Sequence, residues 1–203
     1  MPDSAQPQFL TTELDPTFLS TPCTVQTNWH VITGAPSCGK TTLIDLLASE
    51  GFHIAPEGGR LYMEREAARG KTTEEIRAHI STLQRGIKTT QLGIERSLRP
   101  THLTFLDRSV LDSLAWYRLF GLDPNEFLPE CFHHRYASVF ILERLPLTLD
   151  GFRFDDDAIV DYLDEWHYRD YRALGYTVLR VPVLPPEERC GFVLERLSEG
   201  GMI

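Results

Sequence analysis

One eight-residue motif constrains the fold of this chain more than any other feature. Residues 34–41 read Gly-Ala-Pro-Ser-Cys-Gly-Lys-Thr, which matches the phosphate-loop pattern G-x-x-x-x-G-K-T. The motif follows an apolar run at 29–33 and precedes a helical pattern that begins at Thr42. At a glycine frequency of about 7%, roughly 1% of chains this long would carry the motif by chance. It therefore predicts a strand, a phosphate-binding loop and a helix, in that order.

The loop residues have separate expected roles. Backbone N–H groups of such a loop converge on a β-phosphate at the helix N-terminus, Lys40 reaches the β and γ oxygens, and the Thr41 hydroxyl ligates Mg²⁺. The alternative is a glycine-rich turn between strand and helix, but such a turn has no use for Gly39-Lys40-Thr41. The residues predicted to bind nucleotide are Gly34, Ala35, Pro36, Ser37, Cys38, Gly39, Lys40, Thr41 and Thr42.

Length and composition favour one α/β domain. The chain has 203 residues, 42% of them hydrophobic, which is enough for a full core. Residues 1–27 are rich in Pro, Ser, Thr and Gln and predict a flexible N-terminal arm, with the domain over 28–203. No apolar run approaches the ~20 residues of a membrane span, and the first residues lack the pattern of a signal or transit peptide. We expect a cytoplasmic protein.

Charge and cysteine usage narrow the choice of partner. The net charge of −9 argues against nucleic acid and favours a small-molecule acceptor. The oligomeric expectation is a monomer or a homodimer. The four cysteines are widely spaced without a C-x-x-C pair, as expected for reduced thiols rather than a disulfide framework or a zinc site.

Strand-like and helix-like segments alternate along the chain. Strands are predicted at 29–33, 52–56, 103–106, 138–142 and 176–181. Helices are predicted at 42–50, 61–69, 73–98, 110–120, 126–134, 156–174 and 186–197. This alternation predicts a parallel sheet covered by helices on both faces, with the residues after the strands meeting in one crevice.

Acidic and basic residues recur at or just past the strand ends: Glu57 with Arg60, Asp107 with Arg108, and Glu143 with Arg144. Phosphoryl transfer needs a carboxylate beside the metal, a base for the acceptor hydroxyl, and cations around the transferred group. Asp107 is the expected Mg²⁺-side carboxylate, with a helix cap before Ser109 as the alternative. Glu57 is the expected base, with a simple ion pair to Arg60 as the alternative.

The motifs together resemble a known group. The chain is similar to the P-loop ATPase/kinase group related to the nicotinamide riboside kinase domain of bacterial NAD regulators. The resemblance covers residues 29–197 and rests on the loop, on L-D-R-S at 106–109, on L-G-Y-T-V-L-R-V-P at 174–182, on an arginine in D-G-F-R-F, and on E-G-G-R at 57–60 where relatives commonly read E-A-A-R. The departure from E-A-A-R predicts an altered acceptor pocket.

This resemblance implies both a fold and further roles. It implies a five-stranded parallel sheet in order 2-3-1-4-5. The layout is also similar to deoxynucleoside kinases, in which a glutamate after the second strand acts on a sugar hydroxyl; Glu57 and Asp107-Arg108-Ser109 match those positions. Arg153 falls where such kinases carry a lid, and a lid arginine stabilises the transferring group. A solvated surface arginine is the alternative.

The combined interpretation is an Mg²⁺/ATP-dependent phosphotransferase that acts on a nucleoside-like hydroxyl acceptor. ATP is the expected nucleotide, with GTP as the alternative, although the chain contains no guanine-reading N-K-x-D element. The rival function is a regulatory NTPase or nucleotide-sensing switch without an acceptor. The residues expected to act in catalysis are Lys40, Glu57, Asp107, Arg108 and Arg153.

Overall fold

Five apolar segments form one parallel sheet in the computed structural model, which describes residues 6–145 and 157–203. The strands are β2 (Trp29–Thr33), β3 (His53–Ala55), β4 (Thr104–Asp107), β6 (Ser138–Leu142) and β7 (Val178–Val181). They lie in the order β3-β4-β2-β6-β7. Numbered by their own succession along the chain, this is 2-3-1-4-5, so the implied fold is confirmed.

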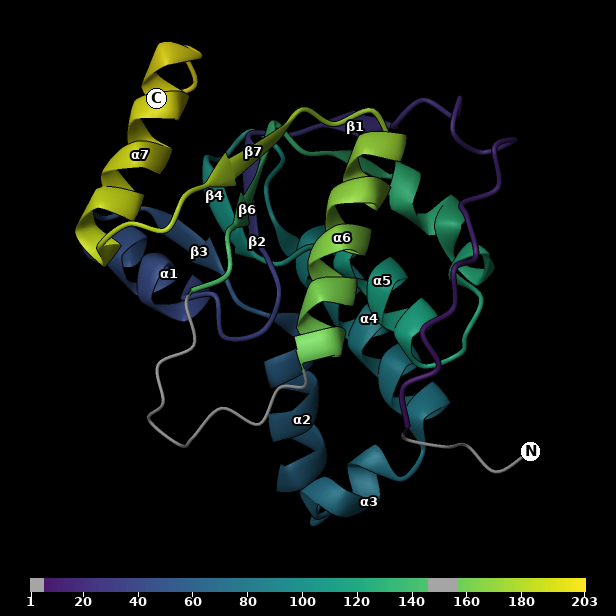
Figure 1. Ribbon diagram of the computed structural model, residues 1–203. Helices are drawn as coiled ribbons and strands as arrows, with labels where there is room; N and C mark the ends of the chain where they lie inside the picture. Colours follow the sequence, from purple (N-terminus) through teal and green to yellow (C-terminus); the bar gives the residue numbers. More distant parts are fainter. Residues whose placement is uncertain (1–5, 146–156) are drawn as a thin grey trace.

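Helices cover both faces of the sheet (Figure 1). On one face lie α1 (Lys40–Ser49) and α7 (Pro186–Glu199), which contact each other. The other face carries α4 (Ile80–Ser97), α5 (Asp112–Leu119) and α6 (Asp157–Ala173). The short helices α2 (Gly58–Ala68) and α3 (Thr73–Arg77) lie at one end of the molecule, beyond the sheet.

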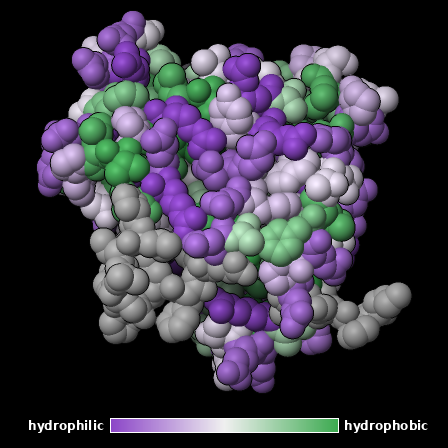
Figure 2. Space-filling view, in the orientation of Figure 1, coloured by the Kyte–Doolittle hydropathy of each residue, from purple (hydrophilic) through white to green (hydrophobic). Residues whose placement is uncertain are grey.

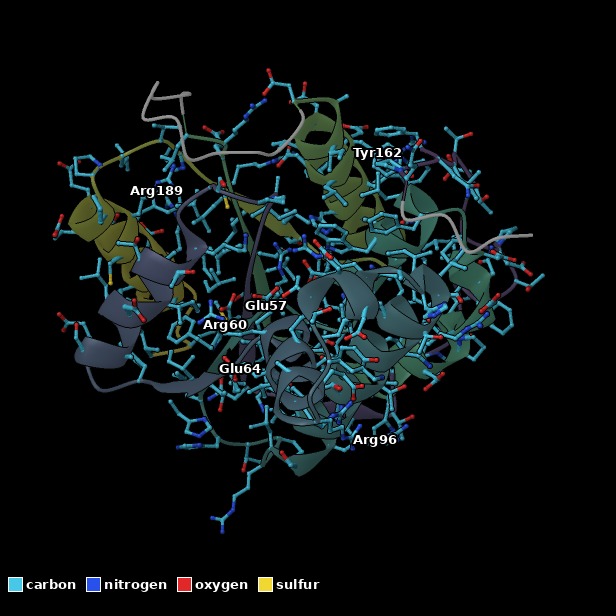
Figure 3. All side chains as sticks on the ribbon, turned by 90° about the horizontal axis from the view of Figure 1, so that it is seen from below. Glu57, Arg60, Glu64, Arg96, Tyr162 and Arg189 are labelled. Carbon is cyan, nitrogen blue, oxygen red and sulfur yellow. The ribbon has the colours of Figure 1, made fainter. Side chains whose placement is uncertain are left out.

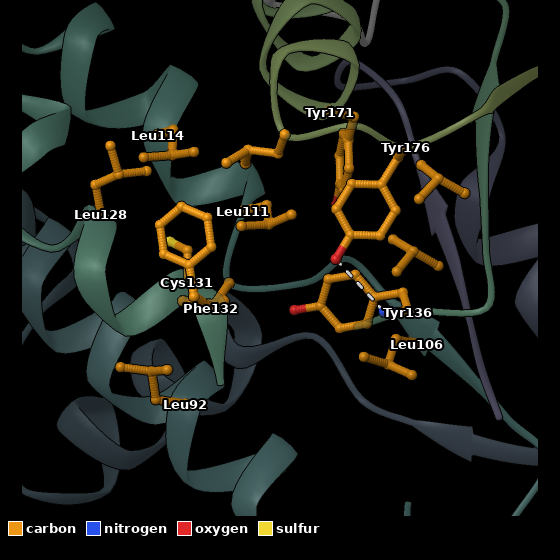
Figure 4. Close-up of a cluster of buried hydrophobic side chains, with 14 of the residues drawn as sticks. Leu92, Leu106, Leu111, Leu114, Leu128, Cys131, Phe132, Tyr136, Tyr171 and Tyr176 are labelled. Carbon is orange, nitrogen blue, oxygen red and sulfur yellow. Dashed lines mark hydrogen bonds between the residues drawn. The ribbon is translucent and has the colours of Figure 1, made fainter. Parts of the chain in front are cut away.

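Alternating side chains of the central strands supply two separate cores. Val31 and Val139 face the α4, α5 and α6 side, whereas Ile32 and Phe140 face α1 and α7. Every residue of β2, β4 and β6 is buried, as expected for parallel strands covered on both faces. Figure 4 shows part of the first core, in which the Tyr136 backbone N–H donates to the Tyr176 hydroxyl over 3.4 Å.

The long helix predicted over 73–98 is wrong as a single element. A capping box between Thr72 and Glu75 starts α3, but the chain leaves helical geometry at His79 (φ −119°, ψ 78°) before α4 begins. The apolar stripe survives the break, because Ile76 of α3 and Ile80 of α4 pack in the same cluster. Periodicity alone therefore predicted the buried face correctly and missed the bend.

The helix predicted over 126–134 is also wrong. Two 3₁₀ turns, η1 (Pro124–Glu126) and η2 (Leu128–Phe132), occupy this stretch, and β5 (His134–Arg135) follows them. Pro124 and Pro129 have no N–H to donate and are tolerated only in the first turn of a helix, so the segment forms short turns. β5 pairs in parallel with β1 (Val25–Gln26) in a second, two-stranded sheet that the sequence did not predict.

The described part of the expected N-terminal arm, residues 6–27, packs on the domain beside α5 and α6 (Figure 1). The backbone N–H of Leu10 donates to Arg118 O over 3.2 Å, and Leu14 is buried. The reason lies in Arg118, which is fully buried and pairs with both oxygens of Asp170 at 2.7 and 2.8 Å. Its remaining Nε–H needs an acceptor, which Thr12 O supplies at 2.5 Å.

The visible surface mixes polar and apolar residues. On the face shown in Figure 2, hydrophilic residues predominate and hydrophobic residues occur in small groups. Among the described residues, only Phe9, Val183 and Ile203 are large hydrophobics that are exposed. No helix within those residues is long and apolar enough to cross a bilayer.

A buried carboxylate in the first core gives the fold a testable pH dependence. Glu95 accepts hydrogen bonds from the Val110 N–H and the Tyr136 hydroxyl, both at 2.8 Å, and lies 3.9 Å from His134. Burial raises the pKa of Glu95 to about 7, against these hydrogen bonds, which lower it. The folded protein therefore holds a proton here between pH 4.5 and 7 that the unfolded chain does not.

We expect the contribution of Glu95 to the free energy of unfolding to fall as the pH rises from 4.5 to 7 and to stay lower above pH 7. The reason is that the unfolded state binds fewer protons than the folded state in that window. A glutamine at this position cannot titrate. The free energy of unfolding of Glu95→Gln, taken relative to that of the wild type, should therefore rise by on the order of 3 kcal/mol from pH 5 to pH 8. Urea unfolding at both pH values measures this difference. A pH-independent difference between the two proteins would contradict the assignment.

Candidate active site

The phosphate loop connects β2 to α1 and depends on glycine at both ends. Gly34 and Gly39 have φ values of 142° and 89°, which favour glycine. A Cβ on Gly34 would lie only 2.9 Å from both Cys38 Sγ and Leu142 O. The loop is therefore shaped by close approach to the end of β6 as well as by its own turn.

Lys40 lies across this loop. Its Nζ donates to Gly34 O at 3.1 Å and Ala35 O at 2.9 Å, and the residue is 8% exposed. Burial is the main reason that the pKa of Lys40 is lowered, and the nearby Arg108 adds to the effect. Thr41 and Thr42, in the first turn of α1, are exposed. The helix start is thus open to a ligand, with a lysine charge held beside it.

Asp107 ends β4 directly beside the strand that leads into the loop, since it pairs in register with Ile32. It is 6% exposed, and within the described residues its Oδ1 atom is buried without a hydrogen-bond partner. Burial raises the pKa of Asp107, and the negative charge of Glu57 raises it further. The cap alternative is wrong, because the Ser109 N–H donates to Asp112 and not to Asp107.

An unpartnered buried carboxylate oxygen suits a hard cation. Mg²⁺ is commonly held by one or two protein oxygens together with substrate phosphates and water. Asp107 at the strand end and the exposed Thr41 hydroxyl fit such a site. The described residues contain no group of three or more His, Cys, Asp or Glu side chains that could hold a metal alone. Mg²⁺ ligation by Thr41 and Asp107 therefore stays a prediction that requires the nucleotide.

Asp107→Asn is expected to lower Mg²⁺-dependent turnover by about a hundredfold or more while nucleotide binding stays detectable, since a neutral amide positions the metal poorly in the transition state. Steady-state rates over a Mg²⁺ titration, with nucleotide binding by calorimetry, measure the effect. Asp45→Asn, an exposed carboxylate on α1, is the control. An unchanged Mg²⁺ dependence in Asp107→Asn would exclude the metal role.

Glu57 and Arg108, from separate strand ends, form an ion pair. Arg108 Nε donates to Glu57 Oε1 at 3.1 Å, so the partner of Glu57 is Arg108 rather than Arg60. Within the described residues no ion pair joins Glu57 to Arg60, although both lie near the start of α2 (Figure 3). Arg108 has a left-handed backbone (φ 67°), a conformation that costs of order 1–3 kcal/mol for a non-glycine residue. Such a conformation persists only where surrounding contacts impose it.

Asp112 is a buried residue that the sequence interpretation missed. It accepts hydrogen bonds from the Thr33 hydroxyl, the Ser109 N–H at 2.8 Å and the Tyr171 hydroxyl at 2.8 Å, and it pairs with Arg108 at 3.4 Å. It therefore ties Arg108 to the strand before the phosphate loop and to α6. The available signal was a carboxylate in the predicted helix 110–120, four residues after Arg108.

The third acidic and basic pair does not join this group. Arg144 pairs with Asp157 and, at 3.2 Å, with Asp161 of α6, and the Glu143 side chain is exposed. Arg153, the predicted lid residue, lies outside the described residues. The structure thus brings together Glu57, Asp107 and Arg108 from the sequence prediction, beside Lys40.

A cavity of about 480 Å³ opens next to these charges. Glu57, Arg108 and Asp112 line it together with Pro36 of the phosphate loop. Its other walls are mainly apolar side chains of α2, α4 and α5, including Trp116, whose ring stacks on Phe120 at 6.2 Å. Among the aromatic residues of the helix after Asp107, Trp116 therefore faces the cavity, whereas Tyr117 is buried in the core.

Comparisons with known proteins identify the family and the fold of the chain. A sequence model of the family described as AAA domain matches residues 29–189. The chain belongs to this AAA domain family. No curated protein matches the chain. The match spans the phosphate loop and the strand ends that carry Glu57 and Asp107, so it confirms the P-loop group that the motifs resemble.

Solved structures show the same fold in proteins of low sequence identity. A NadR protein in complex with NR is 18% identical with a TM-score of 0.57, over 85% of this chain and 51% of that one. A deoxyadenosine kinase from M. mycoides with bound dATP is 12% identical with a TM-score of 0.55, over 84% of this chain and 99% of that one. A shikimate kinase from Aquifex aeolicus is 13% identical with a TM-score of 0.51, over 86% of this chain and 98% of that one. The chain spans about half the length of the NadR protein.

Proposed function

We propose that this AAA domain protein is an Mg²⁺/ATP-dependent phosphotransferase that acts on a small, nucleoside-like hydroxyl acceptor. One observation carries the proposal: the Glu57–Arg108 pair and the phosphate loop border one cavity of about 480 Å³. A carboxylate between a phosphate loop and a cavity of ligand size is where a kinase needs its base. A switch that only hydrolyses nucleotide has no need of this cavity.

The lining suits an acceptor with a flat apolar part and a polar edge. Trp116 offers an aromatic surface, and Gln84, a glutamine only 4% exposed, contributes an amide that can both donate and accept hydrogen bonds. The structures of the NadR protein with NR and of deoxyadenosine kinase with dATP support this class of acceptor by analogy of fold.

Each residue has a defined part in the proposed reaction. Glu57 takes the proton of the acceptor hydroxyl, and Arg108 holds that carboxylate in place at 3.1 Å. Lys40 neutralises charge on the transferred phosphoryl group. Thr41 and Asp107 hold Mg²⁺, which when bound offsets charge on the β- and γ-phosphates. Arg153, which lies outside the described residues, is proposed to complete the charge balance.

The test is ATP turnover by the purified protein, alone and with a panel of nucleosides and sugars. We expect one acceptor to raise turnover and to appear as its phosphate ester, identified by mass spectrometry, and GTP to support a lower rate than ATP. Slow hydrolysis that no acceptor accelerates would instead indicate the regulatory NTPase. Gel filtration of the same sample distinguishes a monomer from a homodimer.

A further inference from the structure

The two glycines of the Glu57-Gly58-Gly59-Arg60 motif have very different surroundings. A Cβ on Gly58 would lie 2.7 Å from Gln91 Oε1 and 2.9 Å from the Gln91 backbone nitrogen. A Cβ on Gly59 would meet nothing closer than Glu57 Oε1 at 3.5 Å, an ordinary contact. Packing therefore requires a glycine at position 58 but not at position 59, because Gln91 of α4 lies so close to Gly58.

Gln91 uses its whole amide at this contact. Its Oε1 accepts from the Gly58 N–H at 2.9 Å, and its Nε2 donates to Arg108 O and to Glu95 Oε1, both at 3.3 Å. The Gly58 N–H can only donate and the Arg108 carbonyl can only accept, so these two partners fix which end of the Gln91 amide faces which way. Gln91 is 3% exposed, and it also lines the cavity.

These bonds join the two halves of the proposed acceptor site. Gly58 follows Glu57 directly, and the Arg108 carbonyl belongs to the residue with the left-handed backbone. One side chain thus holds the backbone next to the proposed base and the backbone of the arginine that pairs with it. Glu95, one turn further along α4, accepts a hydrogen bond from the Val110 N–H. Two side chains of α4 therefore make hydrogen bonds to the backbone at residues 108–110.

We infer that Gln91 is a positioning residue, which sets the Glu57 carboxylate and the Arg108 guanidinium at their working separation through the backbone on either side. The inference rests on the proposed function for its effect on catalysis. It also accounts for the first glycine of E-G-G-R, since the Cβ of an alanine at position 58 would clash with the amide and the backbone of Gln91.

The test compares Gln91→Ala and Gly58→Ala with Gly93→Ala as the matched control, because Gly93 is an exposed glycine of the same helix, α4, where an added Cβ would meet nothing within 4 Å. Both Gln91→Ala and Gly58→Ala should lower kcat for the acceptor identified with the wild-type protein by roughly 10- to 100-fold, since a small misplacement of a base is enough to do so. ATP affinity by calorimetry should stay within a few-fold, because the phosphate loop is untouched. Gly93→Ala should retain wild-type kcat, because Gly93 does not line the cavity.

Two further readouts separate positioning from a loss of stability and from a failure of the proposed function. A purely structural role would lower the melting temperature of Gln91→Ala and leave kcat per folded molecule unchanged, which would overturn the inference. Crystal structures of the variants provide a readout that needs no acceptor. The 3.1 Å distance from Arg108 Nε to Glu57 Oε1 should lengthen beyond 4 Å in Gln91→Ala and Gly58→Ala but not in Gly93→Ala. An unchanged distance in both variants overturns the inference, whereas a wild-type protein that phosphorylates no acceptor overturns only the proposed function.

Discussion

Glu57→Gln is expected to slow phosphoryl transfer to the acceptor by about 10²- to 10⁴-fold, the usual contribution of a positioned base. Gln keeps the shape of the side chain and can still accept a hydrogen bond from Arg108, but it cannot take up the proton of the acceptor hydroxyl. ATP affinity should change by no more than a few-fold, since Glu57 lies at the cavity and makes its ion pair with Arg108 rather than with a loop residue.

The measurement is transfer of labelled γ-phosphate to an identified acceptor, with ATP binding by calorimetry in parallel. Glu64→Gln is the control, because Glu64 is an exposed carboxylate on the same helix (Figure 3). Parallel losses of ATP binding and transfer would show that Glu57 holds the nucleotide site together and is not the acceptor-side base. A loss confined to slow hydrolysis would support the switch.

Lys40→Ala is expected to abolish productive triphosphate binding and turnover while the protein stays folded. Among the described residues, Lys40 Nζ donates to the carbonyls of Gly34 and Ala35 and to Cys38 Sγ at 3.6 Å, and no core cluster there includes Lys40. Its loss removes a charge-assisted contact to the phosphates that no other loop residue can supply.

Turnover, nucleotide affinity and circular dichroism of the folded variant test this expectation. Lys71→Ala removes a lysine whose partner is Glu66 at the far end of α2, and it should keep wild-type turnover. Wild-type turnover in a folded Lys40→Ala protein would remove the basis for any nucleotide-dependent enzyme. A nearly complete loss in Lys40→Ala with only a partial loss in Asp107→Asn would agree with their separate parts at the phosphates and at the metal.

Local sequence pattern was enough to predict the strand, loop and helix that form the proposed nucleotide-binding part of the site. The strand at 29–33, the phosphate loop and the helix after it follow from an apolar run, two glycines and a lysine within a few residues of each other, and β6 lies at the predicted 138–142. The placing of Glu57 and Asp107 after their strands also followed from sequence, because parallel strands bring their carboxyl ends to one edge of the sheet. The strand order came from the resemblance.

The tertiary structure decided how these residues are paired. Glu57 pairs with Arg108, 51 positions away, because β3 and β4 are neighbours and the Arg108 backbone turns left-handed after β4. Gln91 reaches both motifs only because α4 packs against α2 at a glycine. Contacts of this kind depend on which helices cross and how closely they approach. The hydrophobic periodicity of a single segment does not predict either property. The sequence therefore predicted that Lys40, Glu57 and Asp107 would meet at one edge of the sheet. Their partners, and buried residues such as Asp112 and Gln91 that hold them, were set by packing between segments far apart in the chain.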